Sequence, residues 1–155
     1  MSVHTATVVL ETDIAGSPEA VFDAITDLRG YGRWLGESGE YGGTAEISDD
    51  PVRAGTTYTE PSSSGTRHGT VTELERPARV TFHQPMTLRP AFLGVLDIVV
   101  TYTLTPGAEG VHLRRVVTLG LDRPVKLLRA LVIPRFRRES DRTMRALKAF
   151  VEARD

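Results

Sequence analysis

The sequence predicts an α+β protein in which a curved antiparallel sheet of about seven strands packs against one long C-terminal helix. Three observations lead to this prediction. Residues 122–155 hold the one long helical pattern of the chain, with apolar residues recurring every three or four positions. The preceding 121 residues consist mainly of short alternating segments separated by turn residues. A length of 155 residues favours a single domain over 1–155.

Composition excludes several classes of function. The net charge of −1 gives no reason to expect nucleic acid as a partner. The chain has no cysteine, which excludes disulfides, thiolate catalysis and zinc–sulfur sites, and its four histidines lack metal-ligand spacing. We therefore expect no metal and no cofactor. Residues 1–16 alternate polar and apolar side chains instead of forming the apolar block of a signal peptide, so we expect a cytoplasmic protein.

The N-terminal segment predicts a strand followed by two short helical elements. Val3–Ile14 alternates with one buried face. Ser17 and Pro18 have the residue types preferred at the N-cap and the first position of a helix. This helix is expected to end near Asp27, and Asp27–Trp34 favours a second short helix or turn, because its two glycines limit helix length.

The middle of the chain predicts loops and short strands. The acidic, glycine-rich segment Gly36–Gly43 is expected to be a mobile loop, and it is followed by two short strands at Thr44–Ser48 and Thr56–Glu60. Thr66–Glu75 and Arg79–Gln84 are then expected to form a hairpin. The apolar loop Pro85–Gly94 is expected to cover part of the protein, because its apolar side chains would otherwise be exposed to water.

The two strongest strand patterns lie just before the helix, at Val95–Thr105 and Val111–Leu121, joined by a turn at Pro106–Gly110. Each alternates apolar and polar residues over its whole length, so one face of each strand is expected to be buried. The residues on the inward faces are Leu96, Ile98, Val100, Tyr102 and Leu104 in the first strand, and Val111, Leu113, Arg115, Val117, Leu119 and Leu121 in the second.

The C-terminal helix has two distinct halves. Pro134 lies inside the pattern, so we expect the helix to bend or restart there. Residues 125–133 are apolar almost all round, and this extra surface is expected to pack on the Pro85–Leu93 loop, with a second subunit or a membrane surface as alternatives. Residues 122–155 carry ten basic and five acidic side chains, which we interpret as a basic solvent face. The second half is expected to carry Phe136, Ser140 and Met144 toward a cavity.

The order of these segments resembles the SRPBCC superfamily, which includes START domains, polyketide cyclases and plant pathogenesis-related allergens. The resemblance covers nearly the whole chain and rests on Ile14–Phe22 after the first strand, on Tyr31 and Trp34 after Asp27, and on Gly69–Val80. It implies a helix-grip fold, with two short helices, a seven-stranded antiparallel sheet and a long C-terminal helix across a cavity. Members of the superfamily differ widely in chemistry, so the resemblance does not assign a reaction.

Arg115 is the most informative candidate for a functional residue, because it occupies an inward position between Leu113 and Val117. A guanidinium in a core needs a carboxylate, carbonyl groups or a ligand anion. The alternatives are a β-bulge that reverses the alternation, or an arginine that reaches water at the sheet edge. His68 is a candidate acid or base if its strand lines the sheet, and otherwise a surface or hydrogen-bonded histidine.

Aromatic side chains on inward sheet positions and on the helix would also line the cavity. Tyr102 combines an inward position with a polar tip. Ser140 is either a small polar gap in the cavity wall or an outward-facing residue. The complete set of expected ligand-binding residues is Arg115, Tyr102, Trp34, Tyr58, His68, Phe82, Phe92, Phe136, Ser140 and Met144.

These residues lead to three hypotheses. The first is a protein, monomeric or homodimeric, that binds a small hydrophobic molecule such as a lipid or polyketide in the cavity. The second is an enzyme of the polyketide cyclase or dehydratase type that uses Tyr102, Arg115 and His68 in the same pocket. The third, less favoured, is a lipid-transfer or membrane-surface module that uses the basic helix. No serine–histidine–aspartate order, phosphate loop or metal cluster is visible, so catalytic residues are not assigned.

Overall fold

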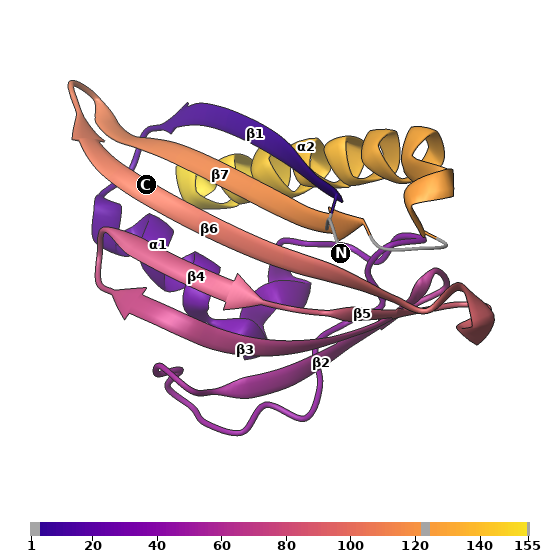
Figure 1. The fold of residues 1–155 in the computed structure, drawn as a ribbon. Helices are drawn as coiled ribbons and strands as arrows, with labels where there is room; N and C mark the ends of the chain where they lie inside the picture. Colours follow the sequence, from indigo (N-terminus) through magenta and orange to yellow (C-terminus); the bar gives the residue numbers. More distant parts are fainter. Residues whose placement is uncertain (1–3, 122–124, 155) are drawn as a thin grey trace.

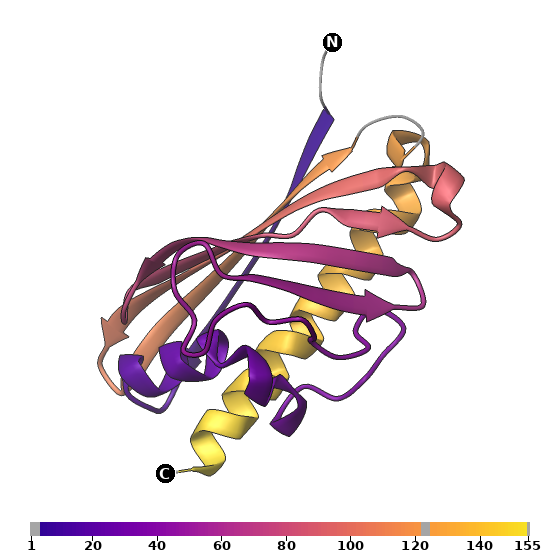
Figure 2. The same ribbon diagram turned by 90° about the horizontal axis from the view of Figure 1, so that it is seen from below.

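The computed structural model describes residues 4–121 and 125–154, and it confirms the predicted helix-grip architecture. Seven antiparallel strands form one sheet in the order β1-β7-β6-β4-β3-β2, with β5 paired to β3 and β6. Both helices cover the same, concave face of this sheet (Figures 1 and 2). The strands are β1 His4–Ile14, β2 Thr57–Ser62, β3 Gly65–Glu75, β4 Arg79–His83, β5 Met86–Leu88, β6 Val95–Gly107 and β7 Gly110–Leu121.

The N-terminal helices form where the sequence predicts them. Helix α1 spans Pro18–Thr26, and the Ser17 side chain caps it by accepting a hydrogen bond from the Ala20 N–H at 3.0 Å. The following 3-10 helix, η1, spans Leu28–Arg33 and is capped by Asp27, whose carboxylate accepts a hydrogen bond from the Gly30 N–H. Apolar side chains from both elements enter the core, so these helices close one end of the space between the sheet and the long helix.

The predicted strand at Thr44–Ser48 is wrong. This segment makes one isolated bridge, in which Ala45 exchanges two backbone hydrogen bonds of 2.8 Å with Thr59. Glu46 adopts a φ of +53°, a left-handed conformation that interrupts an extended chain. The segment therefore follows the edge strand β2 without becoming a strand itself.

The apolar stretch Pro85–Gly94 also differs from the loop that we expected. Its first part forms β5, which continues the line of β4 between β3 and β6 after an interruption at Gln84–Pro85. Met86 is buried there, whereas the 3-10 helix η2 at Ala91–Leu93 leaves Phe92 81% exposed. The stretch therefore covers the core with one residue and leaves another in solvent.

The long helix does not restart at Pro134. A 3-10 segment, η3 at Val125–Leu128, leads into α2, which runs without interruption from Arg129 to Ala153. Pro134 lies in the second turn of α2, where its missing N–H costs one hydrogen bond near the helix end. The expected division into two pieces at Pro134 is therefore wrong, and the change of helix type lies at Leu128–Arg129 instead. None of the helices in the described parts of the chain is long and apolar enough to span a bilayer.

The core lies between the concave face of the sheet and the two α-helices. All the inward positions predicted for β6 and β7 are buried, except that Arg115 is partly exposed. From α2, Met144, Leu147 and Val151 pack into this core.

The ring of Tyr58 lies over Gly69 on the neighbouring strand, so that a side chain at residue 69 would overlap the ring.

We predict that Gly69→Ala destabilises the protein. A Cβ atom at residue 69 would lie 2.1 Å from the Tyr58 ring, so the ring must move out of its packed position. The expected loss in the free energy of unfolding is about 1–3 kcal/mol, measured by urea denaturation. Gly32→Ala is the matched control, because no atom lies within 4 Å of its new Cβ. Equal stabilities for the two variants would contradict the packing described for Tyr58.

A pH-dependent contribution to stability is expected from His112. Its Nε2 lies 3.0 Å from Glu11 Oε1 and its Nδ1 lies 2.8 Å from Asp13 Oδ1, and these hydrogen bonds raise the pKa of the imidazole above its ordinary value of 6.5. Because the folded pKa exceeds the unfolded one, the added stability is complete below about pH 6.5 and is lost as the pH rises through the folded pKa.

The measurement is urea unfolding between about pH 6 and about pH 9 for the wild type, His112→Gln and His68→Gln. The wild type and His68→Gln, which alters an exposed histidine on β3, should lose this stability with rising pH. His112→Gln should lack that part of the pH dependence. A pH profile of His112→Gln that is parallel to the wild-type profile would refute the assignment.

Candidate functional site

A small cavity of about 60 Å³ lies between the concave face of the sheet and α2. More than half of the side chains that line it carry a polar group, so the lining is amphipathic and not simply hydrophobic. The strands contribute Tyr58, Glu60, Arg67, Phe82, Ile98, Val100, Tyr102, Arg115 and Val117; the helices contribute Leu28, Tyr31, Phe136, Glu139, Ser140 and Thr143; and the connecting segments contribute Leu35, Tyr41 and Gln84.

Three inward aromatic rings form a row across the sheet. Tyr58, Phe82 and Tyr102 come from β2, β4 and β6, and successive rings meet edge to face with centroids 6.1 and 6.3 Å apart. All three are buried and line the cavity, as predicted from the strand patterns. The row offers an apolar wall against which a planar ligand can pack.

Arg115 lies at the end of this row and points inward, as predicted. Its guanidinium carbon lies 5.2 Å from the centroid of the Tyr102 ring, and its Nη1 donates a hydrogen bond to the Tyr102 hydroxyl. Its Nε donates to Ser140 Oγ on α2 at 3.3 Å. Ser140 is thus the polar gap in the helix wall, one of the two alternatives for this residue.

The charge of Arg115 is not neutralised by a neighbouring acid. Among residues 4–121 and 125–154, no carboxylate lies within 4.0 Å of its nitrogen atoms. The two acids of the cavity wall are engaged elsewhere, Glu60 with Arg67 and Glu139 with Arg142. The guanidinium therefore retains donors and a positive charge that an anionic group in the cavity would meet.

A second inward arginine, which was not predicted from the sequence, is paired with an acid. Arg67 Nε donates to Glu60 Oε1 at 3.2 Å, and both side chains are less than 10% exposed. Thr44 donates to the other carboxylate oxygen of Glu60 at 2.8 Å. In a buried pair of this kind each charge compensates the other, so removing one partner leaves an uncompensated buried charge and destabilises the fold.

Burial keeps three of the tyrosine side chains in the cavity wall protonated. It raises the pKa of Tyr31 and of Tyr58 well above the ordinary value of 10.0, with smaller contributions from neighbouring tyrosines and from Glu60. Burial also raises the pKa of Tyr41. Tyr31 donates its hydroxyl to the Ile25 carbonyl, and Tyr58 donates to Gln84 Oε1 at 2.7 Å. These phenols therefore act as neutral hydrogen-bonding groups and not as bases.

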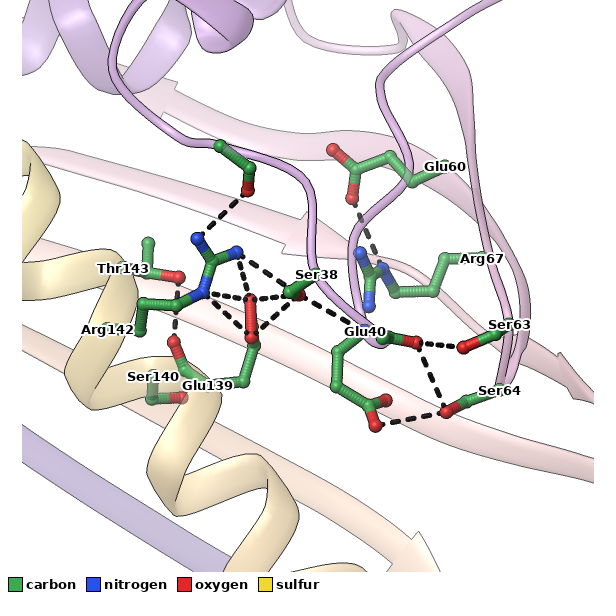
Figure 3. A network of polar contacts seen from close by, with 12 residues as sticks. Ser38, Glu40, Glu60, Ser63, Ser64, Arg67, Glu139, Ser140, Arg142 and Thr143 are labelled. Carbon is green, nitrogen blue, oxygen red and sulfur yellow. Dashed lines mark hydrogen bonds and ion pairs between the residues drawn. The ribbon is translucent and has the colours of Figure 1, made fainter.

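The glycine-rich segment Gly36–Gly43 closes one side of the site against α2. Figure 3 shows Arg142 reaching from the helix to this segment, where its Nη1 donates to the Gly36 carbonyl at 2.9 Å and its Nη2 to Ser38 Oγ at 3.3 Å. Ser38 also contacts both oxygens of Glu139 at 3.2 Å. At the other end, Ser64 donates to Glu40 at 3.0 Å. The segment is thus held by polar contacts alone at these points.

Four of the ten predicted site residues lie elsewhere. His68 is exposed, because the inward positions of β3 are Gly65, Arg67, Gly69 and Val71. Trp34 lies outside the cavity wall and instead lines a separate groove of about 720 Å³, open to solvent, which is formed by α1, η1, β3 and the C-terminal end of α2. Phe92 is exposed at the tip of η2, and Met144 is buried in the core without lining the cavity. The other six line the cavity.

Signals for two missed residues were present in the sequence. Tyr58 was placed inward, and Glu60, two residues later on the same strand, must face the same side. The glycines on either side of Arg67, at positions 65 and 69, indicated a face where a neighbouring ring or chain comes close. A pattern search that looks only for apolar residues overlooks an inward face built from glycine and a charge pair.

Comparison with known proteins identifies the family of the chain and structures that share its fold. The sequence profile of a family described as "Polyketide cyclase / dehydrase and lipid transport" matches residues 5–152. A protein of Mesorhizobium loti is 24% identical, with a TM-score of 0.72 over 97% of this chain and 99% of that chain. No curated protein matches the chain significantly.

Two solved structures of characterised proteins share the fold at lower identity. A point mutant of Thalictrum norcoclaurine synthase, in complex with a transition-state analogue, is 14% identical with a TM-score of 0.73, over 97% of this chain and 96% of that one. The di-domain ARO/CYC StfQ of the steffimycin biosynthetic pathway is also 14% identical with a TM-score of 0.73, over 97% of this chain and 51% of that chain. At these identities the likeness concerns the fold alone.

We predict that Glu60→Gln destabilises the protein strongly, because it leaves the buried Arg67 guanidinium without its counter-charge. The expected loss in the free energy of unfolding is about 3–5 kcal/mol, measured by chemical denaturation. The double change Glu60→Leu with Arg67→Met should recover much of that loss. Asp23→Asn, which breaks an exposed bidentate pair with Arg76, serves as a control and should cost much less. A small effect of Glu60→Gln would contradict this account.

Proposed function

Because the chain belongs to the polyketide cyclase/dehydrase and lipid transport family, we propose that it binds a small organic ligand with a planar apolar body and one oxyanion, such as a carboxylate, phenolate or enolate. The single observation that carries this proposal is Arg115, a guanidinium in the cavity wall without an acidic partner among the described residues. The row of Tyr58, Phe82 and Tyr102 supports a flat body, and Arg115 at its end supports an anion beside it.

The size of the cavity favours a compact ligand over a long-chain lipid. Pockets for drug-sized ligands span about 300–1,000 Å³, whereas this cavity measures about 60 Å³. A ligand of two fused rings therefore requires the wall to move. Part of that wall is the segment Gly36–Gly43, whose contacts with Arg142 and Ser64 are polar and can be replaced by water, whereas its Tyr41 side chain is buried in the core.

Two arginines on β7 provide a matched test of ligand binding. Arg115→Met keeps a long side chain but removes the inward charge, whereas Arg114→Met makes the same change on the exposed face of the strand. We predict that Arg115→Met weakens binding of naphthoate about 10- to 100-fold, as expected for lost charge-assisted hydrogen bonds, and leaves binding of the neutral naphthamide nearly unchanged. Calorimetric titration of the full chain gives both affinities.

Arg114→Met should bind both compounds as the wild type does. The proposal fails if Arg115→Met binds naphthoate as tightly as the wild type. It also fails if the wild type binds neither compound and native mass spectrometry of the purified protein shows no bound small molecule.

A second candidate is an enzyme of the cyclase or dehydratase type. The specific observation in its favour is the hydrogen bond between Arg115 and the Tyr102 hydroxyl. A carbonyl oxygen placed beside this pair would receive hydrogen bonds from Arg115 and from the Tyr102 hydroxyl, which polarise the carbonyl group and stabilise negative charge on its oxygen. His68 has no part in this chemistry, because it faces away from the cavity. If aromatic polyketide substrates give no turnover with the wild type, this candidate is removed.

A further inference from the structure

The largest exposed apolar side chains gather at one end of the molecule. Phe92, Leu127 and Leu131 are 81%, 79% and 64% exposed, and Val95 is 53% exposed. Phe92 lies in η2 and Val95 just after it, whereas Leu127 lies in η3 and Leu131 in the first turn of α2. Figures 1 and 2 both show η2 and the start of α2 at the same end of the fold. We define these four residues as the apolar end.

This exposure is not the ordinary scatter of surface leucines. Apart from Val9, at 37%, these four are all the strongly exposed large apolar side chains among the described residues. Burying a leucine or phenylalanine side chain is worth about 1.5–3 kcal/mol. Four such residues on neighbouring turns therefore indicate a surface that is covered when the protein functions.

The surroundings of the apolar end are strongly basic. From Val125 to Arg138 the chain has five basic residues and no acidic one, and the segment between Glu75 and Asp97 is also free of acids and carries Arg89 beside η2. Arg135 and Arg138 lie one and two turns after Leu131 and are exposed like it. Of the basic residues in this segment, Arg135 alone has an acid within 4.0 Å among residues 4–121 and 125–154, with Glu40 at the limit of that distance. The basic residues of the segment are Lys126, Arg129, Arg135, Arg137 and Arg138.

We propose that the apolar end docks on the surface of an anionic lipid bilayer, with Phe92, Leu127 and Leu131 entering the interface and the arginines contacting lipid headgroups. Apolar side chains flanked by arginines, without acids, are what an interfacial helix presents to such a surface. The proposal is independent of which ligand the cavity takes.

Two other partners fit this surface less well. A second copy of the chain, packed about a two-fold axis, would bring two copies of this basic segment together, and like charges across an interface oppose association. A nucleic acid would compensate the arginines but would leave the leucines against a hydrated phosphate backbone. An anionic bilayer satisfies both the charge and the apolar side chains.

The experiment is co-sedimentation of the full chain with vesicles of phosphatidylcholine alone, or of equal parts phosphatidylcholine and phosphatidylglycerol. We expect binding to the anionic vesicles only, and a loss of that binding between about 0.1 M and about 1 M salt, where the Debye length falls from about 10 to about 3 Å. Leu127→Ser with Leu131→Ser should reduce the bound fraction at low salt by at least about tenfold. Arg135→Gln with Arg138→Gln should weaken binding by about fivefold for each arginine.

Matched controls distinguish this surface from general stickiness. Val9→Ser removes an exposed apolar side chain from β1, and Arg114→Gln removes an exposed arginine from β7; neither should change vesicle binding. All variants alter exposed side chains, and circular dichroism verifies that each is folded. The proposal is overturned by an absence of binding at low salt, or by equal binding of the Leu127/Leu131 variant and the wild type. A dimer in sedimentation velocity that dissociates in the Leu127/Leu131 variant would assign the surface to a second copy and would also overturn it.

Discussion

The space between sheet and helix is organised by the cost of burying charge. Two arginines point into it, and a guanidinium removed from water must be compensated. Arg67 is compensated within the protein, because Glu60 faces it from the neighbouring strand at 3.2 Å. Arg115 is partly exposed, and among the described residues its hydrogen-bond partners are the hydroxyl groups of Tyr102 and Ser140. Among the described residues, the two arginines of the cavity wall therefore differ: Arg67 has an acidic partner and Arg115 has none.

The two arginines therefore have different roles in the same cavity wall: Arg67 stabilises the fold, and Arg115 is available to a ligand. The Glu60–Arg67 pair links the edge strand β2 to β3 on the same inward face as the aromatic row, and Thr44 donates a hydrogen bond to the second oxygen of Glu60. Arg115 is placed where α2 passes over β7, and Ser140 makes room for it at the point where one more large apolar residue would continue the helix stripe. A larger residue at 140 would fill the space that the guanidinium occupies.

The fold could be predicted from the sequence because it depends on patterns that local spacing records. The alternation over Val95–Leu121 and the apolar stripe of α2 have a period of two and of about 3.6 residues, and Ser17 and Pro18 are residue types that mark a helix start; strands β6 and β7 and helix α1 were found where these signals placed them. The inward direction of Arg115 followed from the same alternation. Prediction failed where the inward face is not apolar. In β3 that face is made of glycines, a valine and an arginine, so the threonine-rich opposite face was chosen and His68 was placed in the cavity.

The ends of elements were harder to predict, since they depend on contacts distant in sequence. Exposure of Phe92 depends on η2 projecting beyond the sheet, and continuity through Pro134 depends on packing of the rest of α2 on the core.

The central claim is that Arg115 recognises an oxyanion inside the cavity. A crystal structure of the protein with naphthoate tests it most directly. The account predicts a carboxylate oxygen within hydrogen-bond distance of the Arg115 guanidinium and the ring system against Phe82 and Tyr102. A naphthoate bound only outside the cavity, with Arg115 still contacting nothing but Tyr102 and Ser140, would contradict it.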